Sequence, residues 1–154
     1  MNRRSLALTL VTTVAGVGFG AAVAVPAAAD WYQNRHEESA AYASGAEAKR
    51  DRGTVPGWLP DGASGVRYAM RTTGGDRLIK ATLPGGALPE GCRAVPDATT
   101  GAAPALKAGW FPEDARGRAT FRCGAYYAYL DGDTLYGWQH HADWVTENRT
   151  RAAS

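Results

Sequence analysis

The chain is poor in cysteine. Its 154 residues contain two, Cys92 and Cys123. Because none precedes Cys92, a lipid-modified N-terminal cysteine is excluded, and the absence of a Cys-x-x-Cys motif argues against a metal or redox site. In an oxidising compartment we expect one structural disulfide between them, which would stabilise the fold by about 3–4 kcal/mol for a loop of roughly 30 residues.

Short catalytic motifs are also missing. The sequence contains no Gly-x-Ser-x-Gly elbow, no His-Glu-x-x-His motif and no phosphate-cradling glycine loop. Ser64 is predicted to lie in a loop with no assignable base. We therefore expect no cofactor and no enzymatic activity. A catalytic cluster assembled only in space stays open as an alternative, which would make the protein a small exported enzyme.

Charge of one sign is not in excess. The chain has 17 basic and 15 acidic residues, and two of the basic ones, Arg3 and Arg4, belong to the N-terminal segment. The remainder therefore carries no net charge, which argues against a nucleic-acid partner. Without the first 29 residues the chain is long enough for one small domain.

The N-terminal segment has the layout of an export signal. Arg3 and Arg4 precede an uncharged run from Leu6 to Ala29, which ends in three alanines. If residues 1–29 are a cleaved signal peptide, the protein is secreted. If they remain, the run is long enough to anchor it in the cell membrane, since about 20 helical residues span a bilayer. In both cases residues 30–154 are extracytoplasmic, and the anchored form has the membrane as a partner.

Residues 30–53 are polar, rich in alanine and free of proline, which predicts a solvated helical spacer. His36 with Glu37 and Glu38 is interpreted as a solvated charge cluster rather than a metal site. A folded β-rich domain is predicted for residues 54–143, followed by a flexible tail at residues 144–154.

A first hairpin is predicted between residues 66 and 83, with a two-residue loop at Gly74-Gly75. The residues of its apolar face are Val66, Tyr68, Met70, Ile79, Ala81 and Leu83. The opposite face carries Arg67, Arg71 and Lys80, which form a candidate anion-binding face for a phosphate-bearing polymer or lipid headgroups. A plain solvated face is the alternative.

A second hairpin is predicted between residues 119 and 140, with its turn at Asp131-Gly132. Four aromatic residues share one of its faces: Tyr127, Tyr129, Tyr136 and Trp138. They form a candidate ligand-stacking face for a sugar. Cys123 has the same phase in the two-residue period of a strand, so a disulfide at Cys123 would turn this face into the core. Both interpretations stay open.

The C-terminal histidines are a further candidate metal site. His140 and His141 would point to opposite faces of a strand, so these two residues and Asp143 are not expected to hold a metal.

Several short segments together resemble small exported or membrane-anchored proteins of actinobacteria. The resembling segments are Trp58-Leu59-Pro60-Asp61, Thr72-Thr73-Gly74, Cys92, Trp110, Cys123 and Leu135-Tyr136-Gly137-Trp138, together with the alanine-rich start. The resemblance covers about residues 58–140 and implies a cell-envelope setting without an assigned activity.

The predicted fold is α+β and mainly β. A small antiparallel sheet of two hairpins is clamped by the disulfide and preceded by an apolar helix and the polar spacer. The predicted function is a non-catalytic extracytoplasmic module that presents this domain to an envelope protein or cell-wall polymer. A carbohydrate-binding module is the first alternative.

Overall fold

The computed structural model describes residues 36–154, and the predicted N-terminal signal or anchor lies outside these residues. The strands are β1 (Glu37–Ser44), β2 (Ser64–Arg71), β3 (Arg77–Thr82), β4 (Cys92–Ala94), β5 (Phe121–Cys123), β6 (Tyr126–Asp131) and β7 (Thr134–Gln139). The α-helices are α2 (Gly45–Asp51), α3 (Ala115–Arg118) and α4 (His141–Ala152). Short 3-10 turns occupy Pro84–Gly86 and Ala98–Thr100.

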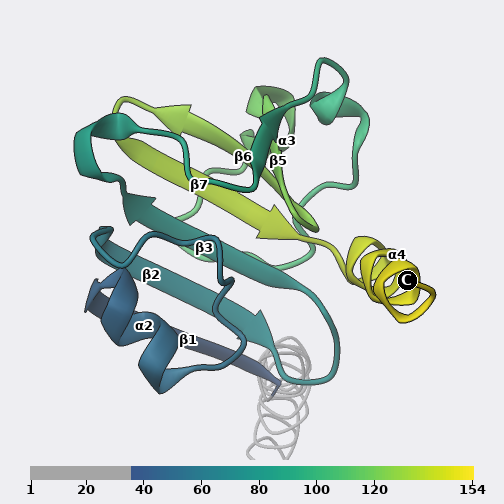
Figure 1. Ribbon diagram of the computed structural model, residues 1–154, viewed down its shortest axis with the longest axis horizontal. Coiled ribbons are helices and arrows are strands. Elements are labelled where there is room, and N and C mark those ends of the chain that lie inside the picture. The colour runs from purple at the N-terminus through teal and green to yellow at the C-terminus, as the bar shows by residue number, and fades with distance from the viewer. Residues whose placement is uncertain (1–35) are drawn as a thin grey trace, which may run out of the picture. The chain divides into compact units, whose positions relative to one another are not determined.

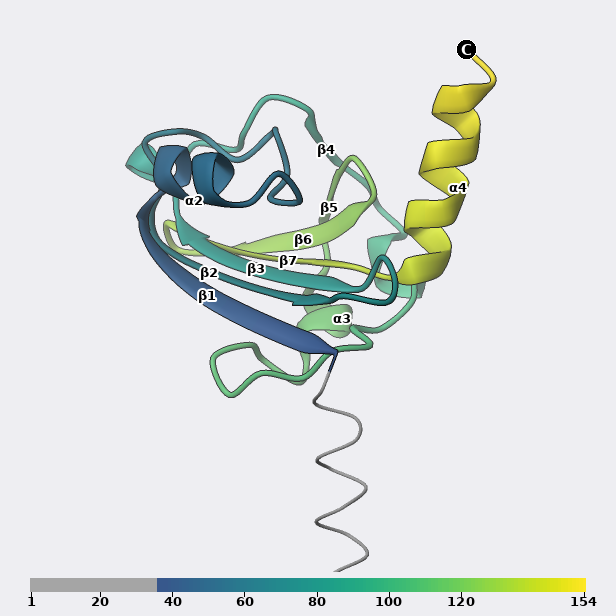
Figure 2. The ribbon, with the colours of Figure 1, turned by 90° about the horizontal axis from the view of Figure 1, so that it is seen from below.

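All seven strands belong to one antiparallel sheet with the order β1-β2-β3-β7-β6-β5-β4 (Figure 1). The predicted fold class, mainly β with an antiparallel sheet and a disulfide, is confirmed, although the sheet has more strands than two hairpins supply. The hairpins meet where β3 pairs with β7. Seen along its edge, the curved sheet has α2 on one side and α3 on the other, and α4 projects beyond its end (Figure 2).

The face of the sheet under α2 carries the first apolar core. Alternate residues of the strands point to this side. Its largest fully buried members are Tyr68, Leu59, Ile79, Leu83 and Leu135. Leu59 belongs to the irregular segment between α2 and β2, so this segment covers the sheet together with the helix.

The opposite face carries a second core built on aromatic side chains. Trp138 is fully buried there, and Phe111 and Leu106 from the long connection between β4 and β5 pack over it. The connection is closely seated, since a Cβ on Gly101 would lie 2.1 Å from the ring of Tyr127. Both faces of the sheet are therefore covered, one of them largely by irregular chain.

The first hairpin has the predicted faces but another register. A two-residue loop at Gly74-Gly75 would pair Met70 with Ile79, whereas Tyr68 pairs with Ile79 and Met70 with Arg77, a register shift of two. The Arg71 amide donates to the Asp76 carbonyl at 3.0 Å, so the loop comprises residues 72–75 and is longer than Gly74-Gly75. The carboxylate of Asp76 also accepts hydrogen bonds from the Arg71 side chain and from the backbone of His141. A shift of two preserves the side-chain phase, and the apolar face is therefore as predicted.

The second hairpin differs more from its prediction. Tyr127 pairs with Trp138 and Asp131 with Thr134, so the turn is Gly132-Asp133. The predicted long strand is in fact two strands, because Gly124 takes a φ of 59° and a tight turn joins β5 to β6. This turn reverses the phase, so Cys123 lies on the side of Tyr126 and not, as predicted, on that of Tyr127.

The predicted helical spacer at residues 30–53 is wrong in the part that the structure describes. Residues 37–44 form β1, which pairs with β2, and only Gly45–Asp51 is helical. Ser44 ends the strand and caps the helix, since its Oγ accepts a hydrogen bond from the Glu47 amide at 3.1 Å. Pairing along β2 therefore outweighs the helix propensity of the alanines.

The predicted domain boundaries also change. The folded unit starts at Glu37 instead of residue 54 and continues to Ser154. The predicted tail contains most of α4, whose first turn is capped by His140, with Nδ1 accepting from the Ala142 amide at 3.2 Å. Within residues 36–154 no helix is long and apolar enough to cross a membrane.

Candidate functional site

One row of paired residues crosses the whole sheet. Successive strands place Glu38 opposite Met70, Met70 opposite Arg77, Arg77 opposite Gln139, and Gln139 opposite Tyr126. The row ends with Cys123 and Cys92, which are directly paired on β5 and β4 and joined by the predicted disulfide. Directly opposite residues point to the same side, so this row places polar side chains at one end of the α2-side core.

Arg77 is the unusual member of this row. Its side chain is buried, with an exposed fraction of 9%, and Nη1 has no hydrogen-bond partner among the described residues. The hydroxyl of the neighbouring Tyr126 is also buried and unpartnered in this part of the chain. A buried cation without a partner costs several kcal/mol, so such groups are rare unless they bind something.

An open pocket borders these groups. Its cavity volume is about 420 Å³, which lies in the range of small-molecule sites. Arg77, Gln139 and the segment 124–126 line one side, and segment 53–58 and one face of α4 line the others. We call this feature the Arg77 pocket.

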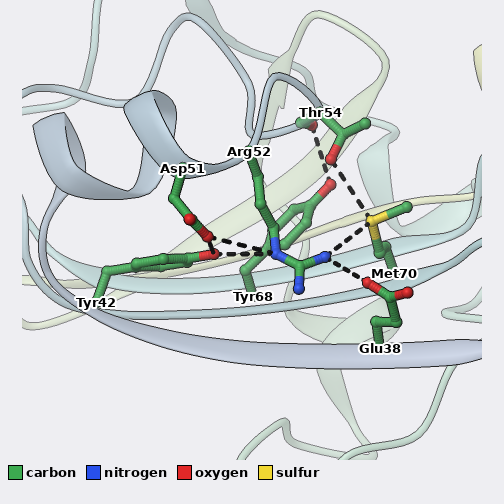
Figure 3. Close-up of polar contacts among 7 residues, drawn as sticks. All are labelled: Glu38, Tyr42, Asp51, Arg52, Thr54, Tyr68 and Met70. Atoms are coloured by element: carbon green, nitrogen blue, oxygen red, sulfur yellow. Dashed lines mark hydrogen bonds and ion pairs between the residues drawn. The ribbon is translucent and has the colours of Figure 1, made fainter.

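The segment 53–58 is held by a polar network on the α2 side (Figure 3). Arg52 donates to Glu38 at 2.6 Å and to the hydroxyl of Tyr42 at 3.0 Å. Tyr68 donates to the backbone carbonyl of Thr54 at 2.9 Å. These contacts tie the start of the segment to β1 and β2 and so position this wall of the pocket.

Within this network, two side chains have shifted pKa values. Hydrogen bonding to Glu38 is the main cause that raises the pKa of Arg52. Burial is the largest cause that raises the pKa of Tyr42, and its hydrogen bond to Asp51 adds to the rise. The network ties Tyr42 and Glu38 of β1 to Asp51 and Arg52.

The start of α4 is tied to the loop between β2 and β3. Asp76 accepts from the His141 amide at 2.9 Å, and Nδ1 of His141 accepts from the Gly75 amide at 3.0 Å. Gln139 donates from Nε2 to the carbonyl of Gly75 at 2.5 Å. Trp144 lies against the same loop, since a Cβ on Gly75 would approach its Cβ to 2.7 Å. These contacts fix the start of α4, whose residues line the pocket together with Arg77.

The two unpartnered groups, Arg77 Nη1 and the Tyr126 hydroxyl, are both hydrogen-bond donors. Burial raises the pKa of Tyr126 well above that of a free phenol, with Tyr68 adding to the rise and the Arg77 charge opposing it. Tyr126 is therefore protonated at neutral pH, and Arg77 is a cation. A donor pair of this kind matches an anionic oxygen group.

The three cations of the predicted anion-binding face have different surroundings. Arg71 is paired with Glu37 at 3.3 Å and with Asp76 at 3.1 Å. Arg67 and Lys80 lie directly opposite each other, and Nζ of Lys80 lies 5.3 Å from the ring centroid of Tyr136. Arg71 thus has two carboxylate partners, which distinguishes it from Arg67 and Lys80.

The predicted ligand-stacking face is mostly core. Trp138 is fully buried and Tyr129 is 2% exposed, while Tyr127 and Tyr136 are half-buried. Tyr127 stacks on Trp138, and Tyr129 stacks on Tyr136 at 5.2 Å between centroids. The stacking interpretation is wrong for the two buried rings. These two rings lie in the core, as the alternative predicted. The reason given for it does not hold, because Cys123 lies in the core on the other side of the sheet.

The two candidate metal clusters are engaged in other contacts. Glu37 and Glu38 are paired with Arg71 and Arg52. His140 and His141 use Nδ1 to accept backbone hydrogen bonds, and Asp143 lies 3.6 Å from Arg122. Among the described residues no group of three potential ligands could hold a metal ion.

Sequence reasoning missed Arg77, Tyr126 and Gln139 as site residues. A signal was present, because Arg77 has the same phase as Ile79 and Ala81, and Gln139 the same phase as Leu135. A charged residue at an inward position of a strand needs a partner. Its isolation, however, depends on neighbours from distant parts of the chain.

Comparisons with known proteins add no assignment to this geometry. No protein-family model, no curated protein and no solved structure matches the chain. Conclusions about function therefore rest on the Arg77 pocket and the chemistry of its lining residues.

Proposed function

We propose that this protein is a non-catalytic extracytoplasmic envelope module that binds an anionic group of a partner in the Arg77 pocket. The observation that carries the proposal is the buried Arg77, a residue that lines an open cavity and whose Nη1 has no hydrogen-bond partner in residues 36–154. The partner is an envelope protein or a cell-wall polymer.

Two further observations support the setting and the absence of catalysis in this proposal. The disulfide between Cys92 and Cys123 is compatible with an oxidising, extracytoplasmic compartment. The one carboxylate that lines the pocket, Glu147, is paired with Arg151 at 3.6 Å. A binding role needs only the donors of Arg77 and Tyr126, whereas hydrolysis would also need a base and a nucleophile.

The proposal predicts weak binding of simple anions. Acetate and inorganic phosphate, added to the full-length protein up to high millimolar concentrations, serve as probes. We expect at least one of them to shift the side-chain NMR resonances of Arg77 and Gln139. Arg77→Met should abolish these shifts, because methionine fills the space without a charge.

Arg67→Met is the matched control. Arg67 is an exposed arginine on the other side of the sheet, so its replacement should leave binding unchanged. Unchanged pocket resonances in the native protein with both probes would contradict the proposal, as would equal shifts in the Arg77→Met variant.

A further inference from the structure

The Arg77 pocket has a chemically divided lining. Arg77 and Tyr126, each with a buried donor that has no partner among the described residues, line its inner end, and its outer end is formed by α4 with Trp144, Glu147 and Asn148. A ligand that satisfies both ends carries one anionic group and a body with both apolar and hydroxyl-bearing surface.

The inner end suits a single negative charge. Arg77 is the one cation of the inner end, because the other cation of the lining, Arg151, lies on α4 and is paired with Glu147. A second negative charge on the ligand would have no free cation and would be repelled by the Glu147 carboxylate. A planar carboxylate therefore fits the guanidinium better than a dianionic phosphate does.

The outer end suits a sugar ring. Trp144 is 39% exposed and is the one large exposed apolar side chain in the described part of the chain. Its indole stacks on His141 at 5.8 Å between centroids and also lines the pocket. Aromatic rings pack well against the C–H surface of amphipathic groups, while the oxygens of Glu147 and Asn148 can accept hydrogen bonds from hydroxyl groups.

A peptide fits this location less well. An extended peptide gains much of its affinity by pairing with the edge of a sheet. The edges of this sheet are β1 and β4, and neither strand lines the pocket.

From these features we infer that the ligand of the Arg77 pocket is a carboxylated sugar, with its carboxylate on Arg77 and Tyr126 and its ring on Trp144. The inference rests on the proposed function and adds the ligand class to it. The two donors at the inner end match the carboxylate, and the indole with two acceptors at the outer end matches the sugar ring.

The test compares glucuronate, glucose and acetate as ligands of the full-length protein by calorimetry and NMR. Glucuronate should bind about tenfold more tightly than acetate, which corresponds to about 1.4 kcal/mol, and glucose should not bind measurably. Trp144→Ala should reduce the affinity for glucuronate to that for acetate, and Trp144→Phe should restore part of it. Arg149→Ala is the control, because Arg149 is exposed on α4 and does not line the pocket.

The outcomes separate this inference from the proposed function. Equal affinities for acetate and glucuronate, or no effect of Trp144→Ala, would overturn the sugar assignment and leave anion binding in place. Tighter binding of glucose 6-phosphate, or equal binding of a blocked dipeptide with a free carboxyl terminus, would assign another ligand class. Failure of every anion, glucuronate included, would contradict the proposed function itself.

Discussion

At the scale of residues, two arginines of one hairpin have opposite environments. Arg71 lies between the carboxylates of Glu37 and Asp76. Arg77, six positions along the chain, is more deeply buried, and within residues 36–154 its Nη1 has no partner. The first arrangement stabilises the fold, whereas the second lowers its stability unless a ligand supplies the missing charge.

This contrast predicts opposite effects of the same substitution. Arg77→Met should leave the free energy of unfolding unchanged or raise it by about 1–2 kcal/mol, because an apolar side chain replaces an unpaired buried cation. Arg71→Met should lower it by about 2–3 kcal/mol, because Asp76, which is 5% exposed, loses its cation.

Urea denaturation of the ligand-free protein and of both variants measures these effects. A large loss of stability in Arg77→Met would mean that Arg77 supports the fold directly. In that case the reason for assigning it to a ligand would disappear.

Tyrosine ionisation gives a second prediction at this scale. Burial is the main cause that raises the pKa of Tyr129 to about 12, and the Arg118 charge opposes the rise. The unfolded chain has a phenol pKa of about 10. The stability gained from the neutral phenol is therefore complete below pH 10 and is lost as the pH rises from about 10 towards 12.

Ultraviolet absorbance of tyrosinate, combined with denaturation at a series of alkaline pH values, tests this prediction. Tyr126 and Tyr42 also have raised pKa values, so Tyr129→Phe should remove one of several late ionisation steps and lessen the loss of stability in this interval. Ionisation of Tyr129 near its ordinary pKa would show that the ring is accessible to water.

At the scale of elements, the turn between β5 and β6 decides which side chains share a face with Cys123. The alternation of the sequence across residues 119–130 is compatible with one long strand. Gly124, with its positive φ, instead reverses the chain and places Cys123 opposite Tyr126. The disulfide therefore holds β5 to β4, and β5 leads directly into residues 124–126, which line the pocket.

The disulfide prediction follows from this placement. Replacing both Cys92 and Cys123 by alanine should lower the free energy of unfolding by about 3–4 kcal/mol, because the bridge closes a loop with a sequence separation of 31. Binding of the acetate or glucuronate probe should also weaken, because β4 no longer holds β5 and the adjoining turn.

Denaturation and the same NMR titration measure the two effects, with reduction of the native protein as an independent route. Unchanged binding in a folded double variant would show that Tyr126 is positioned without the bridge. An unchanged free energy of unfolding would contradict the stabilising role.

At the scale of the whole molecule, the site depends on contacts between distant segments. The pocket combines segment 53–58, the ends of β3 and β7, the turn before β6, and α4. The pairing of β3 with β7 joins two hairpins that are separated by the long connection. The open pocket lies where segment 53–58 and α4 meet the strand ends that carry Arg77 and Gln139.

The sequence by itself determined the local pattern of this protein. Alternation predicted the apolar face of the first hairpin and the four aromatic residues that share a face of the second, because the side-chain period of a strand is two and survives a register shift of two. The number of cysteines and the export-like start predicted the disulfide. The alternation also placed Arg77 on the same face as Ile79 and Ala81. It does not show whether another segment supplies a hydrogen-bond partner for Arg77.

Only the tertiary structure decided the remaining features. The alanine-rich segment 37–44 is a strand because β2 offers it backbone partners, and the aromatic face is core because the distant connection at residues 95–119 covers it. Arg77 is the centre of the candidate site because segment 53–58, the end of β7 and α4 come together around it and supply no partner for its Nη1 in residues 36–154. These outcomes depend on which distant segments meet, and local periodicity carries no information about that.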